Sequence, residues 1–346
     1  MANPARAWLT PVVALALLVS GCSSGSGSPS QPAGSLGPGE AVSPGSSARA
    51  PSQRISIATG GTSGVYYIYG GGLAQVLSKH VPDVEATAEV TAASVENLNF
   101  IHQKSADIAF TLADTAYDAV RGEGAFKEPL PLRALAVLYT NITHIVTLAD
   151  SGIETVADLK GKRVSTGAPN SGTDVIAERI LQVSGIDPNK DITRERLSVK
   201  ESAEALQDRK IDAFFWSGGL PTAGVEELAA TPGIRIRLIS HGDLVPTLVE
   251  KYGPLYVTRT VPAGTYLNTP EATVSAVPNL LVVHQEMPED LAYAITKALF
   301  EHKDELVAVH PAAQELDPKE AAVGAPMEYH PGAIRYYKEV GAWPGD

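Results

Sequence analysis

The sequence predicts an α/β fold of two domains, and three observations support this prediction. From Arg54 onward, short runs rich in β-branched residues alternate with segments of helical periodicity, which is typical of α/β proteins. The chain has 346 residues, 44% of them hydrophobic, which is enough for two domains of ordinary size. One local pattern also occurs twice: an apolar strand, a glycine turn with hydroxyl side chains, and a helix. We therefore expect one such turn in each domain.

The first copy of this pattern is residues 60–67 (GGTSGVYY), directly after the predicted strand 55–58. Glycine permits the turn, and the first N–H groups of the next helix have no partner within that helix. Together with the helix dipole, such groups suit an anion. Four hydroxyl side chains make the turn a candidate site for a small polar ligand: Thr62, Ser63, Tyr66 and Tyr67. An ordinary Ser/Thr helix cap is the alternative interpretation.

The helix predicted after this turn contains three consecutive glycines, residues 70–72. Each costs up to about 1 kcal/mol relative to alanine in a helix interior. We expect a neighbouring element to approach the backbone closely here and to offset that cost.

Two more strands of the first domain end at polar residues that can start a helix. The strand predicted at 84–91 is followed by Ser94, and the strand at 107–112 by Asp114, each the expected cap of the next helix. In open α/β sheets, ligands bind at the carboxyl ends of strands. Three such junctions in succession favour a ligand site, although capping alone also produces them.

A second domain is predicted after residue 141. The runs 135–138 and 144–148 indicate two strands, and we expect the chain to cross between domains in the polar interval 139–143. A short helix at 153–159 and a strand at 162–165 lead to the second copy of the pattern, residues 167–174 (GAPNSGTD), and its helix. A ligand held between two such turns on separate domains would link binding to domain closure.

The remaining segments complete both domains. We predict a helix at 202–208, a buried strand at 211–216, a strand at 234–239, an irregular segment at 252–266, a strand at 276–283 that returns to the first domain, and a helix at 288–309. Trp216 ends the buried strand, where it either lines a cleft or belongs to the core.

Residues 1–21 are predicted to be a lipoprotein signal peptide. Arg6 precedes an apolar run, 8–19, that is shorter than the roughly 20 residues of a membrane-spanning helix. The run ends in VSGC, which resembles a bacterial lipobox, so we expect cleavage before Cys22 and a lipid on its thiol. Residues 22–53 are nearly all Ser, Gly, Pro and Ala, which predicts a disordered tether. The lipid would hold the protein at the cell membrane. An uncleaved anchor or another cleavage site is the alternative, and each still places the remainder outside the cytoplasm.

Charge and motifs exclude several classes of function. A formal net charge of −12 argues against nucleic acid as a partner, because basic residues supply most of that binding energy. Cys22 is the single cysteine, so neither an intramolecular disulfide nor a cysteine zinc site can form. No Gly-x-Ser-x-Gly, phosphate-binding-loop or His-Glu-x-x-His pattern occurs, and scattered histidines such as His144 and His241 indicate structural roles. We predict no catalytic residue, no metal and no cofactor.

Six segments in the same order resemble the TAXI family, the extracytoplasmic solute receptors of TRAP transporters. They are residues 60–67, 94–97, 158–164, 171–173, 211–215 and 330–333. The likeness extends from about residue 54 to the C-terminus. It implies a two-domain periplasmic-binding-protein fold of type II (Venus flytrap). With the crossing placed as above, residues 54–141 and 273–346 form ligand-binding domain 1, and residues 142–272 form ligand-binding domain 2.

The resemblance also implies a ligand site. The family's first ligand segment corresponds to Thr62, Ser63, Tyr66 and Tyr67, its second to Ser94 and Asn97, and its third to Asp114. The second domain contributes Ser171 and Thr173, with Phe215, Trp216 and Pro221 as an apolar wall. The chain departs from the family pattern at Leu112, where a polar residue is frequent, and at Asn170, which replaces a glycine. Residues 330–333 (HPGA) are expected to pack rather than to bind ligand.

By this resemblance the protein is a monomeric, non-enzymatic receptor. It would bind a small organic anion or amino acid, such as glutamate or a dicarboxylate, and pass it to a TRAP membrane permease. Two alternatives stay open, an extracytoplasmic hydrolase and a sensor domain of the same fold that signals to a partner.

Overall fold

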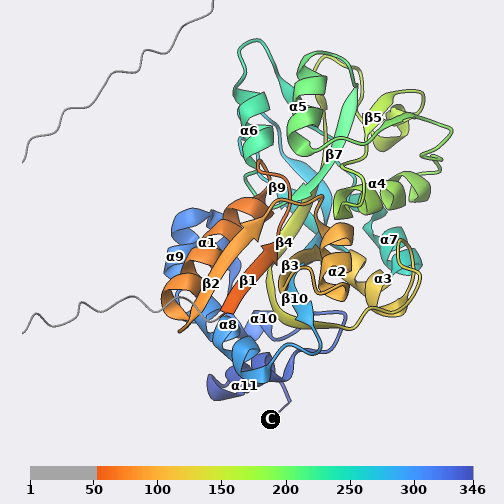
Figure 1. Ribbon diagram of the computed structural model, residues 1–346. Coiled ribbons are helices and arrows are strands. Elements are labelled where there is room, and N and C mark those ends of the chain that lie inside the picture. The colour runs from red at the N-terminus through yellow and green to blue at the C-terminus, as the bar shows by residue number, and fades with distance from the viewer. Residues whose placement is uncertain (1–52, 346) are drawn as a thin grey trace, which may run out of the picture. The chain divides into compact units, whose positions relative to one another are not determined.

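The structure, a computed structural model, describes residues 53–345, which belong to one compact unit. They form a mixed α/β fold of two lobes built on a ten-stranded sheet (Figure 1), which confirms the predicted fold class. The strand order is β2-β1-β3-β10-β4-β7-β5-β6, with β8 paired to β4 and β9 paired to β10. The leader, Cys22 and the tether up to residue 52 lie outside the described residues, and what is predicted for them stays a prediction.

The first lobe contains three parallel strands, each followed by a helix. The strands are β1 (Gln53–Ala58), β2 (Val84–Glu89) and β3 (Ile108–Leu112), and the helices are α1 (Val65–His80), α2 (Ser94–His102) and α3 (Ala113–Arg121). The carboxyl ends of these strands therefore meet at one edge of the sheet. The C-terminal part of the chain completes this lobe with α8 (Glu289–Glu301), α9 (Lys303–Val309), the 3-10 turn η3 (Pro311–Glu315), α10 (Pro318–Ala321) and α11 (Pro331–Glu339).

The second lobe contains the parallel strands β5 (Arg163–Ser165), β6 (Thr193–Glu195) and β7 (Ala213–Gly218). Its helices are α4 (Gly172–Val183), α5 (Val199–Gln207), α6 (Ala223–Ala230) and α7 (Val245–Tyr252). The short elements η1 (Val156–Leu159), β8 (Ile236–Leu238) and η2 (Gly242–Leu244) complete it. As in the first lobe, a strand leads through a glycine turn into a helix, here from β5 into α4.

Two long antiparallel strands, β4 (Leu132–Leu148) and β10 (Ala272–His284), run through both lobes (Figure 1). β4 pairs with β10 up to Ile142 and with β7 from Ile142 to Thr147. The prediction of two separate strands here is wrong, because the polar interval 139–143 continues the ladder without a break. The connection between lobes is thus a pair of hydrogen-bonded strands.

Three other expectations are corrected. The segment expected to be irregular contains β9 (Val257–Val261), and the helix expected at 288–309 is divided into α8 and α9 at His302. Ser94 is not a cap: α2 begins at Ser94 itself, after Ala93 with a φ of 86°. Residues 330–333 do pack as expected, since a Cβ on Gly332 would lie 2.3 Å from the carbonyl oxygen of Glu289.

Close packing accounts for two of the three glycines in α1. A Cβ on Gly70 would lie 2.5 Å from Cγ2 of Thr59, and one on Gly72 would lie 3.1 Å from Val309. A Cβ on Gly71 would meet no described atom within 4 Å. The expected close approach is therefore confirmed at Gly70 and Gly72 but not at Gly71.

We expect Gly70→Ala to lower the free energy of unfolding by about 1–3 kcal/mol, because the new methyl group overlaps Thr59 in a packed core. Gly71→Ala is the matched control and should raise it by up to about 1 kcal/mol, because alanine is the better helix former and has room here. Urea denaturation of both variants measures the difference. Equal effects of the two substitutions would contradict the packing argument.

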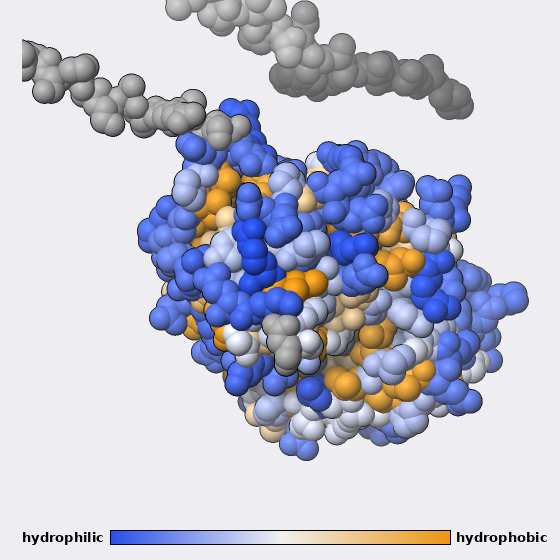
Figure 2. Space-filling model, turned by 90° about the horizontal axis from the view of Figure 1, so that it is seen from below, coloured by the Kyte–Doolittle hydropathy of each residue, from blue (hydrophilic) through white to orange (hydrophobic). Residues whose placement is uncertain are grey.

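Hydrophilic residues predominate on the face seen in Figure 2, and hydrophobic residues show there in separate patches. The most exposed large hydrophobic side chains of the described residues are Val90 and Leu267, each 58% exposed. They belong to different lobes, so they do not form one docking face. Among residues 53–345, no helix is both long enough and apolar enough to span a membrane.

Candidate ligand-binding site

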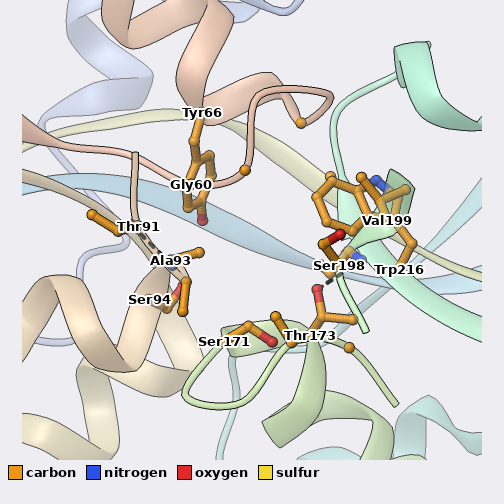
Figure 3. A pocket seen from close by; sticks show the side chains of 18 of the residues that line it. Gly60, Tyr66, Thr91, Ala93, Ser94, Ser171, Thr173, Ser198, Val199 and Trp216 are labelled. Carbon is orange, nitrogen blue, oxygen red and sulfur yellow. Dashed lines mark hydrogen bonds between the residues drawn. The ribbon is translucent and has the colours of Figure 1, made fainter. Parts of the chain in front are cut away.

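A cavity of about 70 Å³ lies where the two lobes meet (Figure 3). The first lobe lines it with residues 60–61, 64–66, 91–94 and 112, and the second with residues 167–168, 171–173, 197–199 and 216–218. Both glycine turns recognised in the sequence therefore line the same cavity, one from each lobe. Figure 3 shows the side chain of Tyr66 reaching toward the space above Ser171 and Thr173.

Five of the twelve predicted ligand-binding residues line the cavity, namely Tyr66, Ser94, Ser171, Thr173 and Trp216. The Trp216 indole lies against the opposite lobe, since a Cβ on Gly64 would be 3.0 Å from the ring. Its N–H donates to Thr222 Oγ1 at 2.9 Å, which fixes the ring plane. Trp216 is thus an apolar wall that touches both lobes.

The serine and threonine hydroxyls of the predicted set that line the cavity are already hydrogen-bond acceptors. Ser94, Ser171 and Thr173 accept the backbone N–H of Leu112, Asp174 and Ser217, respectively, at 3.1, 3.1 and 3.2 Å. An accepting hydroxyl keeps its own hydrogen, so each can still donate to a ligand. These groups therefore favour a ligand with acceptor oxygens.

The other seven predicted residues do not line the cavity: Thr62, Ser63, Tyr67, Asn97, Asp114, Phe215 and Pro221. Thr62 is exposed, and Phe215 is buried in a hydrophobic cluster of the second lobe. The fully buried Asn97 amide donates to the carbonyls of Thr59 and Phe110 at 2.7 and 2.8 Å. Asn97 thereby ties the ends of β1 and β3 together.

Asp114, predicted as a ligand contact, belongs instead to a buried ion-pair network between the lobes. Arg179 on α4 lies 3.3 Å from Asp114 and 2.5 Å from Asp118, both on α3. The Tyr256 hydroxyl donates to Asp114 at 2.7 Å and accepts from Arg179 at 2.8 Å. Asp114 is fully buried, so its charge is matched by Arg179 rather than by a ligand.

Burial raises the pKa of Asp118 from its ordinary 3.8 to about 6. The nearby charges of Asp114 and Glu123 also raise this pKa, whereas the Arg179 guanidinium lowers it by a smaller amount. Because the native pKa is the higher one, this group stabilises the fold below pH 4 and loses that contribution as the pH rises through 6. We expect the free energy of unfolding of the wild type, relative to Asp118→Asn, to fall by up to about 3 kcal/mol between pH 4 and 7. Urea denaturation at four pH values measures it, and a constant difference would contradict the assignment.

The two lobes also meet at the start of α2. The carbonyl oxygen of Asn170 accepts the N–H groups of Val95 and Glu96 at 3.1 and 3.2 Å. Asn170 has a φ of 63°, a left-handed conformation that asparagine tolerates better than most residues. This conformation explains how asparagine replaces the glycine of the TAXI-like pattern. The two hydrogen bonds hold the turn of the second lobe directly on the first lobe.

The start of α1 is open toward the cavity. Its N-cap, Gly64, offers no side chain, and no described side chain caps the first turn. Gly64, Val65 and Tyr66 all line the cavity. The free N–H groups of this turn and the helix dipole therefore offer a negative ligand group a favourable position.

A row of buried polar side chains shares a sheet face with Leu112 and Ser217, two residues that line the cavity. The pairs Leu112–Asn279, Asn279–Tyr139 and Thr143–Ser217 are direct cross-strand partners, so their side chains share one face. Asn141 lies on the same face of β4, because it is two residues from Tyr139 and two from Thr143, and every second side chain of a strand points to the same face. Leu112 and Ser217 line the cavity at the two sides of this row. We call Asn141, Thr143, Ser217 and Asn279 the polar floor.

The polar floor is unusual because its polar atoms have no hydrogen bond within the described residues. This holds for both amide atoms of Asn141 and Asn279 and for the hydroxyls of Thr143 and Ser217. All four side chains are more than nine-tenths buried. Each unpaired buried group costs about 1–3 kcal/mol, which a structural role does not repay.

Tyr66 extends this set of unpaired groups into the cavity. It is 8% exposed, and its hydroxyl faces the side chains of Ser94 and Asn141 without forming a hydrogen bond to either. Burial raises the pKa of Tyr66 above its ordinary value, so the hydroxyl is neutral and able both to donate and to accept.

Sequence reasoning missed the polar floor, although a signal was present. Asparagine is depleted in strands, yet Asn141 and Asn279 stand in the middle of β-rich runs. Two such amides within β-rich runs indicate a functional reason for their presence.

A second hollow of about 360 Å³ lies nearby, lined among others by Asp118, Asp174, Glu178, Arg179 and Arg196. Its charges are paired with one another or with Arg194. We therefore favour the smaller cavity, which is lined by the unpaired hydroxyls of Tyr66 and Ser217, as the ligand site.

Residues 57–341 match the NMT1-like family, which is most of the chain. The protein belongs to this family. Solved structures similar to this NMT1-like protein include the periplasmic aliphatic sulphonate binding protein SsuA from Escherichia coli, at 17% identity over 84% of this chain and 80% of that one, with a TM-score of 0.46. Another is a putative L-cystine ABC transporter from Listeria monocytogenes, at 13% identity over 74% and 94%, with a TM-score of 0.48.

One side-chain cluster among residues 53–345 of this NMT1-like protein has metal-binding chemistry: His80, His302 and Glu305. It lies on the outside of the first lobe, at the ends of α1 and α8. Lys79 already contacts Glu305 at 3.0 Å, and the two imidazole rings stack with centroids 3.4 Å apart. This cluster shares no residue with the cavity.

The buried histidines have structural partners, as predicted for His144 and His241. His144 contacts the Tyr266 hydroxyl at 2.8 Å, and His241 contacts Ser275 at 3.1 Å. Burial lowers the pKa of each to about 4, so both rings are neutral at pH 7.

Proposed function

We propose that this NMT1-like protein is an extracytoplasmic solute receptor that binds one small organic molecule in the cavity between its lobes. The observation that carries the proposal is the pair of glycine turns, one on each lobe, that line a single cavity. A ligand held by both turns favours the arrangement in which the lobes touch. No catalytic constellation accompanies this cavity among the described residues that line it, and we propose a binding protein rather than an enzyme.

Binding then proceeds in two steps. The ligand first contacts the open start of α1 and Tyr66 on the first lobe, after which the second lobe closes and brings Ser171, Thr173 and Trp216 onto it. The strands β4 and β10 are the connection about which the lobes move. Contacts between the lobes, such as Asn170 to α2 and Arg179 to α3, form at the same time and complete the face that a partner recognises.

The partner in this proposal is a membrane permease of the TRAP type, which the six TAXI-like segments favour. The domains are residues 54–141 with 273–346, and residues 142–272. A lipid on Cys22 and the tether, which ends at residue 52 because β1 begins at Gln53, hold a monomeric receptor near the cell membrane. Glutamate and other amino or dicarboxylic acids are the ligands that the resemblance suggests, and the cavity itself narrows this choice below.

A thermal-shift screen of the full chain against amino, dicarboxylic and monocarboxylic acids tests the receptor function. A ligand at a hundred times its Kd adds roughly 2.7 kcal/mol to the free energy of unfolding, which is a clear shift in Tm. If no acid raises the Tm while an ester or glycoside is hydrolysed, the hydrolase alternative replaces the receptor proposal.

A further inference from the structure

We propose that the polar floor is a ligand subsite and that the ligand is a small hydroxy-monocarboxylic acid: one carboxylate, at least one hydroxyl and no second charge. This inference rests on the proposed receptor function and specifies its ligand. It is based on the unpaired polar atoms of the floor and on the absence of charged side chains from the described cavity lining.

The carboxylate of the proposed ligand is inferred from the groups that the first lobe presents to the cavity. The first turn of α1 offers uncapped N–H groups beside the Tyr66 hydroxyl, which is buried and unpaired. The hydroxyls of Ser171 and Thr173 face this position from the second lobe (Figure 3). All these groups donate hydrogen bonds, which a single carboxylate accepts.

The absence of a second charge follows from the cavity lining. Among residues 53–345, no Arg, Lys, Asp or Glu side chain lines the cavity. The buried carboxylate of Asp114 is committed to Arg179 and Tyr256. A ligand ammonium or a second carboxylate would enter a buried site without a counter-charge, which is strongly unfavourable. This argues against glutamate, other zwitterionic amino acids and dicarboxylates.

The hydroxyl follows from the polar floor. The Oδ1 atoms of Asn141 and Asn279 are acceptors without a donor, and a carboxylate brings no hydrogen to them. A ligand hydroxyl donates to one such oxygen and accepts from an amide or hydroxyl of the floor. An unsubstituted fatty acid would leave these atoms unpaired, which is how a polar site rejects an analogue that lacks one group.

The size of the cavity, about 70 Å³, favours a short acid. Leu112, Leu197 and Val199 line it beside the polar groups, so the carbon skeleton meets apolar side chains. A three-carbon acid satisfies this description, and three-carbon acids also provide a chemically matched series for the test.

The test is isothermal titration calorimetry of the full chain with five three-carbon acids at pH 7: lactate, glycerate, propionate, alanine and malonate. We expect lactate or glycerate to bind at least about tenfold more tightly than propionate, the equivalent of one satisfied hydrogen bond. Alanine and malonate should bind at least about a hundredfold more weakly than the better hydroxy acid.

Two variants test whether the polar floor causes the preference for lactate over propionate. Asn141→Leu and Asn279→Leu remove floor amides at similar volume, and each should abolish the preference for lactate over propionate while propionate affinity changes less than about threefold. Asn189→Leu, at an exposed position, is the control and should keep the preference. The Tm of both floor variants without ligand should equal or exceed that of the wild type, because unpaired buried groups are removed. This separates lost binding from lost folding.

The outcomes distinguish the ligand class from the receptor function. Tighter binding of alanine or malonate than of lactate and glycerate overturns the ligand class and leaves the receptor function standing. A lactate preference that survives in both floor variants overturns the subsite. No saturable binding of any acid to a folded protein overturns both proposals.

Discussion

Arg179→Met is expected to lower the free energy of unfolding by about 3–5 kcal/mol, the cost of breaking a buried ion pair by removing one partner. Methionine keeps the apolar part of the side chain, so the loss comes from the charge. Asp114, which is fully buried, and Asp118 would then share no cation. Urea denaturation at pH 7 measures the effect.

The control for this variant is Arg209→Met, whose partner is Asp150 at 2.8 Å. Both side chains of that pair are more than half exposed, and exposed pairs contribute about 0–1 kcal/mol. Similar losses in the two variants would contradict the role assigned to burial. A loss in Arg179→Met that is smaller at pH 4 than at pH 7 would support it, because burial raises the pKa of Asp118 to about 6 and its carboxyl group is protonated at pH 4.

Gly172→Val is expected to weaken ligand binding by at least about a hundredfold while the protein stays folded. Gly172 begins α4 in the second lobe, and a Cβ there would lie 2.6 Å from Leu112 and 2.7 Å from Ser94 of the first lobe. The larger side chain would hold the lobes apart, and packed interfaces do not yield to such overlap without cost. Calorimetric titration with the tightest-binding acid measures the affinity.

Two controls make this second result interpretable. Circular dichroism and a cooperative melt establish that Gly172→Val folds, and Gly71→Ala, whose Cβ has room, should bind as the wild type does. If Gly172→Val is folded and binds normally, closure of the lobes onto the ligand is not required, and the two-step mechanism is wrong.

Much of the fold could be predicted from local sequence, because alternating strand and helix patterns are local properties. The turns at residues 60–67 and 167–174 were identified in this way, and both line the cavity. The break predicted within β4 was wrong for a physical reason. Its polar residues suggested a loop, but the ladder with β10 and β7 satisfies the backbone there, and Asn141 and Thr143 lie on the sheet face that carries Ser217.

Much less of the site could be predicted. Asp114 and Asn97 have the residue types of ligand contacts. Asp114, however, pairs with Arg179, and the Asn97 amide donates to the carbonyls of Thr59 and Phe110. Whether a polar side chain meets a ligand or the protein depends on partners that are remote in sequence. Asn279 belongs to the polar floor only because β10 lies between β3 and β4 in the sheet. A local sequence pattern does not contain this strand order.

The fluorescence of Trp216 tests the central claim, that the ligand lies in the cavity between the lobes. Trp216 lines that cavity, whereas Trp343 lies near the C-terminus and Trp8 in the predicted leader. In the Trp8→Phe, Trp343→Phe background, the three-carbon acid that binds most tightly should change the emission saturably, with the Kd found by calorimetry. Saturable calorimetric binding that leaves the emission of Trp216 unchanged would place the ligand elsewhere and contradict the account.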